Sequence, residues 1–450
     1  MNVLEDNYYE PIYKSWTVLI YANGNNDLEP EISKSLLDIE RIGAGTNTNV
    51  IVQLARAPYK LIKSMRPNLL DQTDIDGGWS GVRRYLVKEN SNISQKRDFK
   101  SVLLDDLGNV NMADPTTLKN FISWGSKKFP SKHLMLILIG HGAGFMGILP
   151  DYTLKYPQIM SMNGLNVAIN KASEETGQKI DILLLDSCYM NMVEIIYELG
   201  IDSKSPSYLI TPQISPIEGL PYDTIMKVLK GINKSDNTKT LIKELVYEVN
   251  NILIKKGISL TVFRLNSFLL RSIKTVISSI STLIIKNKID LKKYATKSHN
   301  GFPTIEICYL INFLKNTTNS FVILINIFII TICIKFINLK CNIGESSLVN
   351  NSGLYIFTPD NEYFKVMGNY YSKMRFTHNN KWITYLSDKK DNYKINKMFF
   401  KYTLPLPDDM PIEGIQNVII SHNPWLNQDE LNNIIEGLGW SCCVRLNDLK

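Results

Sequence analysis

Apolar and polar positions along the chain divide it into short buried strands and amphipathic helices. Continuous apolar runs bounded by Gly, Pro, Asn or Asp predict strands that are buried on both faces. Such strands are predicted at 17–22, 50–54, 133–139, 182–185 and 208–211. Between them, apolar residues spaced three or four positions apart predict helices. This alternation predicts an α/β fold with a mostly parallel sheet flanked by helices.

Helix starts and turns refine this pattern. Asp114-Pro115 predicts a helix that ends near Lys128, because a cap residue precedes proline at the first helical position. Asp27 follows the turn after the first strand and is predicted to cap a helix over 30–42. Segments 79–87 and 100–107 predict a hairpin or edge pair, and three helices are predicted near 223–231, 237–256 and 265–287.

One apolar segment, 321–339, departs from the pattern of its surroundings. It reads FVILINIFIITICIKFINL and is about long enough to span a bilayer, although Asn326 and Lys335 interrupt it. Three interpretations stay open: a retained intron translated in frame, a buried helix or strand pair, and a membrane helix. The first fits a chain that is rich in Asn, Lys and Ile throughout. Membrane association is therefore left undecided.

Composition and charge exclude some classes of function. The 450 residues carry a net charge of +7, and the basic residues are scattered, which indicates a solvated surface rather than a nucleic-acid face. The six cysteines show no C-x-x-C pair, so neither a zinc site nor a disulfide framework is expected. The first residues lack the basic and apolar regions of a secretory signal, which favours a cytoplasmic location.

A histidine and a cysteine each follow a predicted strand. The run 134–139 leads into Gly140-His141-Gly142-Ala143-Gly144, and the run 182–185 leads into Asp186-Ser187-Cys188, 47 positions later. The carboxyl ends of parallel strands meet at one edge of a sheet, so we expect His141 and Cys188 to lie close together. A thiol beside an imidazole is a nucleophile with a proton carrier. The order and spacing match those of caspases, but the local caspase signature is absent.

The residues around Cys188, LDSCYM, resemble the clostripain family of cysteine peptidases, which has the caspase-like fold. Four further segments agree in family order: WTVLIYANGNNDLE at 16–29, DLGNVNMADPTTLKNFISW at 106–124, SYLITPQISPIEGLPY at 207–222 and SGLYIFTP at 352–359. The resemblance implies a peptidase domain over 16–390, after a polar leader (1–15) and before a C-terminal extension (391–450). It also implies a late core strand at 353–357 and a smaller C-terminal region.

The resemblance implies roles for individual residues. His141 and Cys188 are expected to form the catalytic dyad, and the N–H groups of Gly142 and Cys188 the oxyanion site. Asp186 shares a strand face with position 188 and is expected to select Arg or Lys in the substrate; capping a following helix is its alternative role. Glu218 is a second candidate acid for that pocket. Family members are often cut between the histidine and the cysteine, which makes Lys155 a candidate autocleavage site.

The resulting prediction is a cysteine endopeptidase acting on peptides or proteins with Arg or Lys at the scissile bond. No cofactor is required, and no EF-hand loop is present, but calcium is left open because some relatives depend on it. Gly142-x-Gly144-x-x-Gly147 formally matches a dinucleotide fingerprint but lacks the helix that must follow it. The alternative from another class is a catalytically inactive homologue that serves as a binding or scaffold protein.

Overall fold

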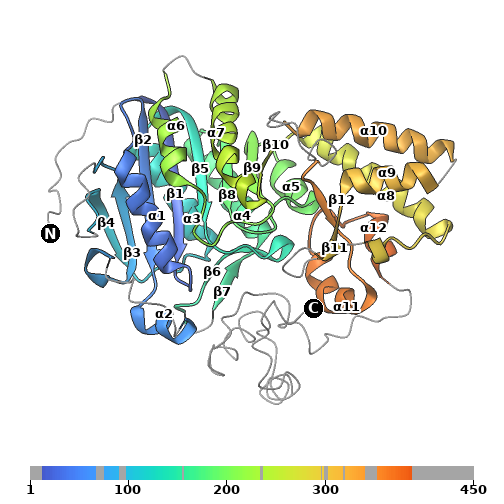
Figure 1. Ribbon diagram of the computed structural model, residues 1–450, viewed down its shortest axis with the longest axis horizontal. Helices are drawn as coiled ribbons and strands as arrows, with labels where there is room; N and C mark the ends of the chain where they lie inside the picture. Colours follow the sequence, from blue (N-terminus) through green and yellow to red (C-terminus); the bar gives the residue numbers. More distant parts are fainter. Residues whose placement is uncertain are drawn as a thin grey trace.

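An eight-stranded sheet forms the larger part of the molecule (Figure 1). The computed structural model describes residues 13–66, 75–90, 98–154, 157–233, 237–294, 296–297, 303–317, 320–339 and 352–387. The strands lie in the order β10-β9-β8-β5-β1-β2-β3-β4. Their bounds are Lys14–Gly24 (β1), Thr48–Arg56 (β2), Gly81–Leu86 (β3), Val102–Gly108 (β4), Ser131–Ile139 (β5), Ile182–Asp186 (β8), Tyr208–Pro212 (β9) and Leu260–Arg264 (β10). The five central strands are parallel, and β3, β4 and β10 add antiparallel edges.

Alternation along the central strands gives the sheet two apolar faces. In β1, Leu19 and Tyr21 belong to one core cluster, whereas Val18 and Ile20 belong to the other. The first face is covered by α3 (Pro115–Lys128), α4 (Met162–Thr176) and α5 (Val193–Gly200). The second is covered by α1 (Glu29–Ile42), α6 (Tyr222–Lys230) and α7 (Thr238–Leu253). The predicted mostly parallel sheet flanked by helices is confirmed.

The C-terminal helices gather at one end of this layered body (Figure 1). They are α8 (Ser267–Lys286), α9 (Ile307–Thr317), α10 (Phe321–Ile337), α11 (Asn361–Tyr371) and α12 (Lys381–Leu386). A small sheet lies among them, made of β11 (Thr296–Lys297), β12 (Pro303–Glu306) and β13 (Tyr355–Phe357). The smaller elements elsewhere are α2 (Tyr59–Met65), β6 (Ile148–Asp151), β7 (Gln158–Met160), η1 (Ile75–Gly78), η2 (Gly144–Met146), η3 (Ile254–Lys256) and η4 (Lys292–Tyr294).

The late core strand expected at 353–357 is present as β13, with Ile356 and Phe357 buried, and it pairs with β12 in the small sheet. A further strand, β10, lies between two predicted helices and pairs antiparallel with β9 at the edge of the main sheet. Its five residues, LTVFR, are too short a run to stand out between long helical patterns.

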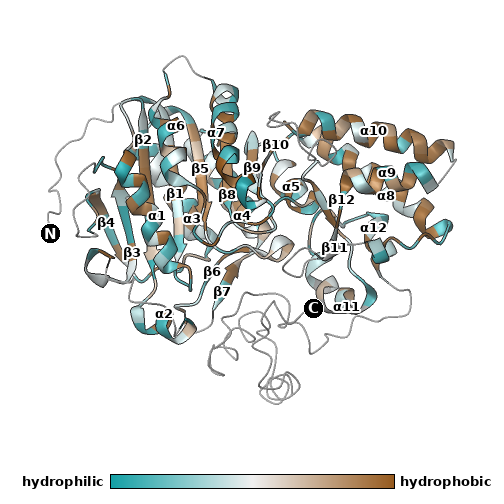
Figure 2. Cartoon of the chain, viewed as in Figure 1, coloured by the Kyte–Doolittle hydropathy of each residue, from teal (hydrophilic) through white to brown (hydrophobic). Residues whose placement is uncertain are grey.

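The apolar segment 321–339 forms a helix that packs on α8. Ile323, Ile330 and Ile337 are buried, and the side chain of Asn326 donates a hydrogen bond of 3.1 Å to Ser279 of α8. Figure 2 shows α8, α9 and α10 as a strongly hydrophobic group. Of the helices in the described residues, α8 alone is long and apolar enough to cross a membrane by length and composition, and 39% of its apolar window is buried. That segment 321–339 derives from a retained intron stays a prediction.

A buried ion pair ties the first helix to the sheet. Arg56 ends β2, and its Nε lies 2.6 Å from Oε1 of Glu29 in the first turn of α1; both side chains are at most 2% exposed. Arg56 also donates to the carbonyl of Ile75 at 2.7 Å, and Ser33 donates to the same Glu29 oxygen at 2.8 Å. These contacts fix the start of α1 against the carboxyl edge of the sheet.

We expect Arg56→Met to lower the free energy of unfolding by about 3 kcal/mol or more, because it leaves the Glu29 carboxylate buried without its counter-ion. The matched control is Arg41→Met, which removes an exposed partner of Asp38 in the same helix and should cost less than about 0.5 kcal/mol. Urea unfolding of the two variants measures the difference. Equal midpoints would contradict the anchoring role of the buried pair.

Candidate active site

Two turns meet where β5 and β8 end. The strands are parallel neighbours, and Ile139 of β5 stands opposite Asp186 of β8. His141 and Cys188 each lie two residues beyond that pair. The hydroxyl of Ser187 donates a 2.7 Å hydrogen bond to the carbonyl of Gly140, which holds the two turns together. The predicted proximity of the histidine and cysteine turns therefore follows from the register of the sheet.

The turns approach so closely that only glycine fits at position 142. A Cβ atom there would overlap the carbonyl oxygen of Cys188 and crowd Ser187 and Met190. Within the part of the chain that the structure describes, neither the Gly142 N–H nor the Cys188 N–H donates a hydrogen bond. Two backbone donors beside a nucleophile are the type of group that stabilises an oxyanion.

The imidazole of His141 is held by a carboxylate. Nε2 of His141 lies 2.8 Å from Oδ1 of Asp27, and the two side chains are 18% and 19% exposed. Burial raises the pKa of Asp27, but the charge and hydrogen bond of His141 and the charge of Arg66 outweigh it, so this pKa is lowered. An ionised carboxylate only accepts, so Nε2 carries the proton in this hydrogen bond and Nδ1 does not face Asp27.

Sequence reasoning missed this role for Asp27. The residue was expected to cap the helix after the first strand, but α1 begins at Glu29, and its N-cap, Leu28, makes no side-chain capping bond. The partner, His141, is 114 positions away along the chain. The parallel pairing of β1 with β5, in which Ala22 stands opposite Ile139, brings the two turns together. The sequence did offer one signal: the turn after the first strand was expected at the carboxyl edge of the sheet, where His141 also lies.

Asparagines fix the turn that carries Asp27. Asn23 and Asn26 both donate side-chain hydrogen bonds to the carbonyl of Pro150, at 2.9 and 3.0 Å. Asn25 donates to Oδ2 of Asp151 at 2.8 Å, and its own carbonyl accepts the N–H of Tyr152 at 2.8 Å. All three asparagine side chains are buried. Strand β6 thus anchors the turn, which explains the run of asparagines after β1.

The thiol of Cys188 is held in its protonated form. Burial raises its pKa to about 11; the backbone N–H of Ser215 opposes this shift from 3.4 Å, and the charge of Asp186 adds to it. The next residue, Tyr189, has a φ of 63°, a backbone conformation that residues other than glycine rarely adopt. Strained backbone of this kind clusters at functional sites.

Asp186 is buried beside the thiol. Its carboxylate accepts hydrogen bonds from the hydroxyls of Ser215 and Tyr222, the latter at 2.8 Å, and from the N–H of Leu220 at 3.2 Å. Burial raises its pKa in spite of these donors. Ser215 therefore contacts both the thiol and this carboxylate. The alternative capping role for Asp186 is wrong, because the next helix, α5, begins at Val193 with Met192 as its N-cap.

The remaining predicted site residues lie apart from this centre. Glu218 belongs to the same loop as Ser215, but it is exposed and its carboxylate pairs with Lys256, whose hydrogen bond lowers the pKa of Glu218. Lys155 lies outside the described residues, between strands β6 and β7.

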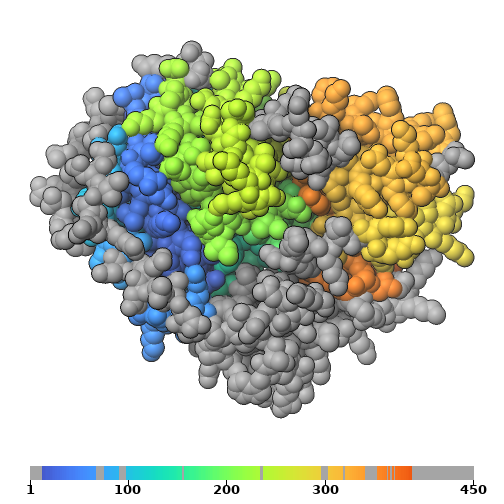
Figure 3. All heavy atoms as spheres, in the orientation of Figure 1, coloured from blue at the N-terminus to red at the C-terminus, as the bar shows by residue number. Residues whose placement is uncertain are grey.

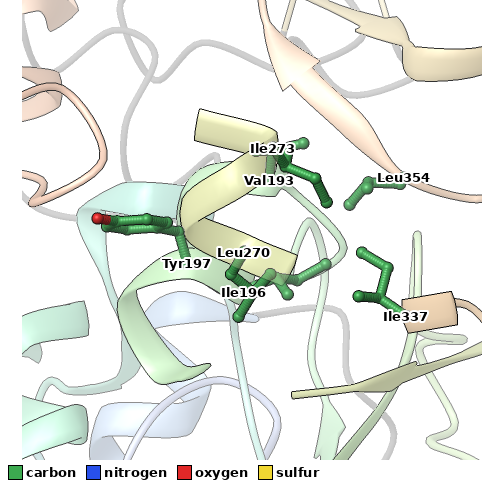
Figure 4. Close-up of a pocket in the computed structure, with 7 residues that line it drawn as sticks. All are labelled: Val193, Ile196, Tyr197, Leu270, Ile273, Ile337 and Leu354. Atoms are coloured by element: carbon green, nitrogen blue, oxygen red, sulfur yellow. The ribbon is translucent and has the colours of Figure 1, made fainter. Parts of the chain in front are cut away.

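No metal-binding cluster competes with this centre in the described ranges. No group of three or more His, Cys, Asp or Glu side chains is placed there to hold a metal ion, and calcium stays an open expectation. Figure 4 shows a pocket between α5, α8 and the end of α10, with the Tyr197 hydroxyl pointing away from its other lining side chains. The other six are Val193, Ile196, Leu270, Ile273, Ile337 and Leu354. It is an apolar packing seam.

Alkylation of Cys188 by iodoacetamide should accelerate about tenfold per pH unit between about pH 7 and pH 10, since only the thiolate reacts. The raised pKa of about 11 places the plateau beyond that range. Mass spectrometry of the Cys188 peptide gives the rate. The control is the urea-unfolded chain, whose rate should level off above the ordinary thiol pKa of about 8.5. A folded-state rate that does not change with pH would mean that Cys188 is already a thiolate.

Comparisons with known proteins agree with this geometry. The model of the clostripain family (Peptidase C11) matches residues 20–419. An inactive zymogen C11 protease from Parabacteroides distasonis has a similar structure, with a TM-score of 0.55, 16% identity, and coverage of 82% of this chain and 99% of that one. A secreted C11 cysteine protease from Bacteroides thetaiotaomicron, in complex with an irreversible peptide inhibitor, has a TM-score of 0.57 with the same identity and coverage.

A search of curated proteins found no match. The likeness to the solved C11 proteases shows the caspase-like fold, and the family model covers most of the chain. The chain therefore belongs to the clostripain family of cysteine peptidases.

Proposed function

We propose that the protein is a cysteine endopeptidase that cleaves peptide bonds after Arg or Lys. The observation that carries the proposal is the juxtaposition of the His141 and Cys188 turns, with the His141 imidazole held through Nε2 by Asp27. Peptide and protein substrates follow from this chemistry. The proposed dyad is His141 and Cys188, and Asp27 is a positioning residue that acts through His141.

In this proposal, Sγ of Cys188 attacks the scissile carbonyl carbon after losing its proton to Nδ1 of His141. The C–N bond breaks as Nδ1 returns that proton to the leaving amine, which gives a thioester. Water then attacks the thioester, its proton passes through the same nitrogen, and the free thiol is restored. The N–H groups of Gly142 and Cys188 hold the developing oxyanion in both steps.

Asp186 supplies the preference for a basic side chain. Its carboxylate is linked to the Cys188 thiol through Ser215, which forms a hydrogen bond with each of them. When a substrate guanidinium binds Asp186, it replaces the hydroxyl groups that donate to this carboxylate in the described structure. The guanidinium also supplies a full positive charge. Glu218, in the same loop and exposed, is the second acid for a substrate that extends outward.

The described arrangement corresponds to a resting state. The Cys188 thiol is protonated and the Asp186 carboxylate is satisfied by the protein's own donors. Displacement of the loop at 213–222 would free both groups at once. Cleavage after Lys155 is the proposed trigger, and the similarity of this fold to that of an inactive zymogen supports an activation step.

The same resting geometry also suits the alternative function, a binding protein that never becomes active. A half-buried thiol with a raised pKa, and an Asp186 carboxylate satisfied by the protein's own donors, would both persist in such a protein. Cleavage of a peptide bond that depends on Cys188 would distinguish the peptidase from the binding protein.

Fluorogenic peptides ending in Arg, Lys, Asp or Leu test the activity and its specificity together. We expect cleavage after Arg and Lys that disappears in Cys188→Ala. Asp186→Asn should lower the ratio of kcat/KM for Arg over Leu peptides about 10²-fold, because it removes the charge that the guanidinium meets. Glu218→Gln should change that ratio much less, because Glu218 is exposed and paired with Lys256.

Cleavage after Asp or Leu by the wild type would overturn the proposed pocket while keeping the dyad. Turnover that survives in Cys188→Ala would overturn the mechanism. Absence of turnover in wild-type protein nicked after Lys155 would favour the binding protein.

Asp27→Asn should lower kcat about 10²-fold or more with little change in KM, since an amide no longer selects the tautomer with Nε2 protonated. Asp27→Glu should restore part of the loss by keeping the charge. The control is Asp38→Asn, a change of the same type on the outer side of α1, with an effect on kcat of less than about twofold. A loss confined to KM, or an unchanged kcat, would contradict the positioning role.

A further inference from the structure

The outer face of α10 is an exposed apolar surface. One side of the helix packs into the protein through Ile323, Ile330 and Ile337. The other side exposes eight apolar residues: Phe321, Val322, Leu324, Ile325, Phe328, Ile329, Ile332 and Phe336. The three phenylalanines are 75%, 66% and 58% exposed. A soluble helix normally turns polar residues to this side, so a surface of this kind indicates a partner.

The charged residues within α8, α9 and α10 have one sign. The sequences of α8, α9 and α10 contain five basic residues and no Asp or Glu. Of the basic residues, Lys286, Lys315 and Lys335 are exposed, and no hydrogen bond or ion pair with another described residue holds them. Each terminates or nearly terminates its helix. The apolar surface is thus bordered by uncompensated positive charge.

The lysines flank the apolar surface at both ends. Asn326 of α10 donates a hydrogen bond to Ser279 of α8, while Ile337 lines one pocket with Leu270 and Ile273 (Figure 4). Leu270 and Ile273 lie nearer the start of α8, so the two helices run antiparallel. Lys286 therefore lies toward the start of α10, and Lys335 lies in its last turn. Lysines at the borders of an apolar band extend their ammonium groups toward lipid headgroups.

We propose that the outer face of α10 binds the surface of an anionic phospholipid bilayer, with the helix lying in the plane of the headgroups. A helix of 17 residues with one side packed on α8 is suited to lie on a membrane rather than to cross it. If a second copy of the chain bound here, its exposed lysines would face the lysines of the first copy. The phosphate groups of an anionic bilayer instead complement these positive charges.

Docking through α10 leaves the proposed catalytic centre accessible. Figure 1 places α10 at the outer end of the C-terminal helices, away from β6 and β7. The centre lies at the β6 side, where the N–H of Leu149 bonds the carbonyl of His141 at 2.9 Å. In the space-filling view, α10 forms part of the outer contour of the molecule (Figure 3). The membrane-bound chain would therefore present its active edge to soluble substrates.

Co-sedimentation of the full chain with vesicles tests this inference. We expect binding to phosphatidylcholine vesicles that contain phosphatidylserine, weaker binding to pure phosphatidylcholine, and a decrease as salt is raised. Phe328→Glu combined with Phe336→Glu should lower the partition coefficient at least about tenfold for each phenylalanine removed from lipid. Tyr247→Glu, at a half-exposed aromatic position on α7, is the matched control and should bind as the wild type does.

A second variant guards against misfolding. Lys315→Gln combined with Lys335→Gln leaves the apolar face intact and should weaken binding to anionic vesicles about fivefold for each lysine removed. Wild-type protein that stays in the supernatant with anionic vesicles would overturn the proposal. Equal loss in Tyr247→Glu would also overturn it, as would a wild-type dimer in light scattering that the phenylalanine variant converts to a monomer.

Discussion

The hydrogen bond between the His141 imidazole and the Asp27 carboxylate is the contact on which the candidate centre depends. It requires β1 and β5 to be parallel neighbours in one register, because the two residues come from turns at the ends of these strands. It also requires the asparagine turn to be fastened to Pro150 and Asp151 of β6. Three separate segments thus position Nε2 of His141, and the proposed mechanism uses Nδ1 for proton transfer.

The cysteine half of the centre is controlled by a different segment. Ser215 donates its backbone N–H to the thiol and its hydroxyl to Asp186, so one loop residue restrains both the nucleophile and the proposed pocket acid. Burial disfavours the ionised form of each group. A single displacement of this loop would change nucleophilicity and substrate binding together. In the proposed mechanism, this loop must move before the peptidase becomes active.

Much of this could be anticipated from local pattern. The central strands and the helix capped by Asp114 were predictable because apolar runs and caps are local signals, and the turns around His141 and Cys188 followed from strand ends. Asp27 was not, because its partner is distant in sequence and only the strand order reveals it. The one-sided packing of α10 was equally hidden, since an apolar segment looks the same whether or not a neighbour covers half of it.

The protonation state of His141 tests the central claim most directly. Nitrogen NMR of protein labelled with ¹⁵N-histidine distinguishes a protonated from an unprotonated ring nitrogen, and His141→Gln identifies the signal among five histidines. The account predicts that the single proton of the uncharged ring lies on Nε2, facing Asp27, with the lone pair on Nδ1. A neutral His141 protonated on Nδ1 would mean that Asp27 does not orient the ring, and would contradict the account.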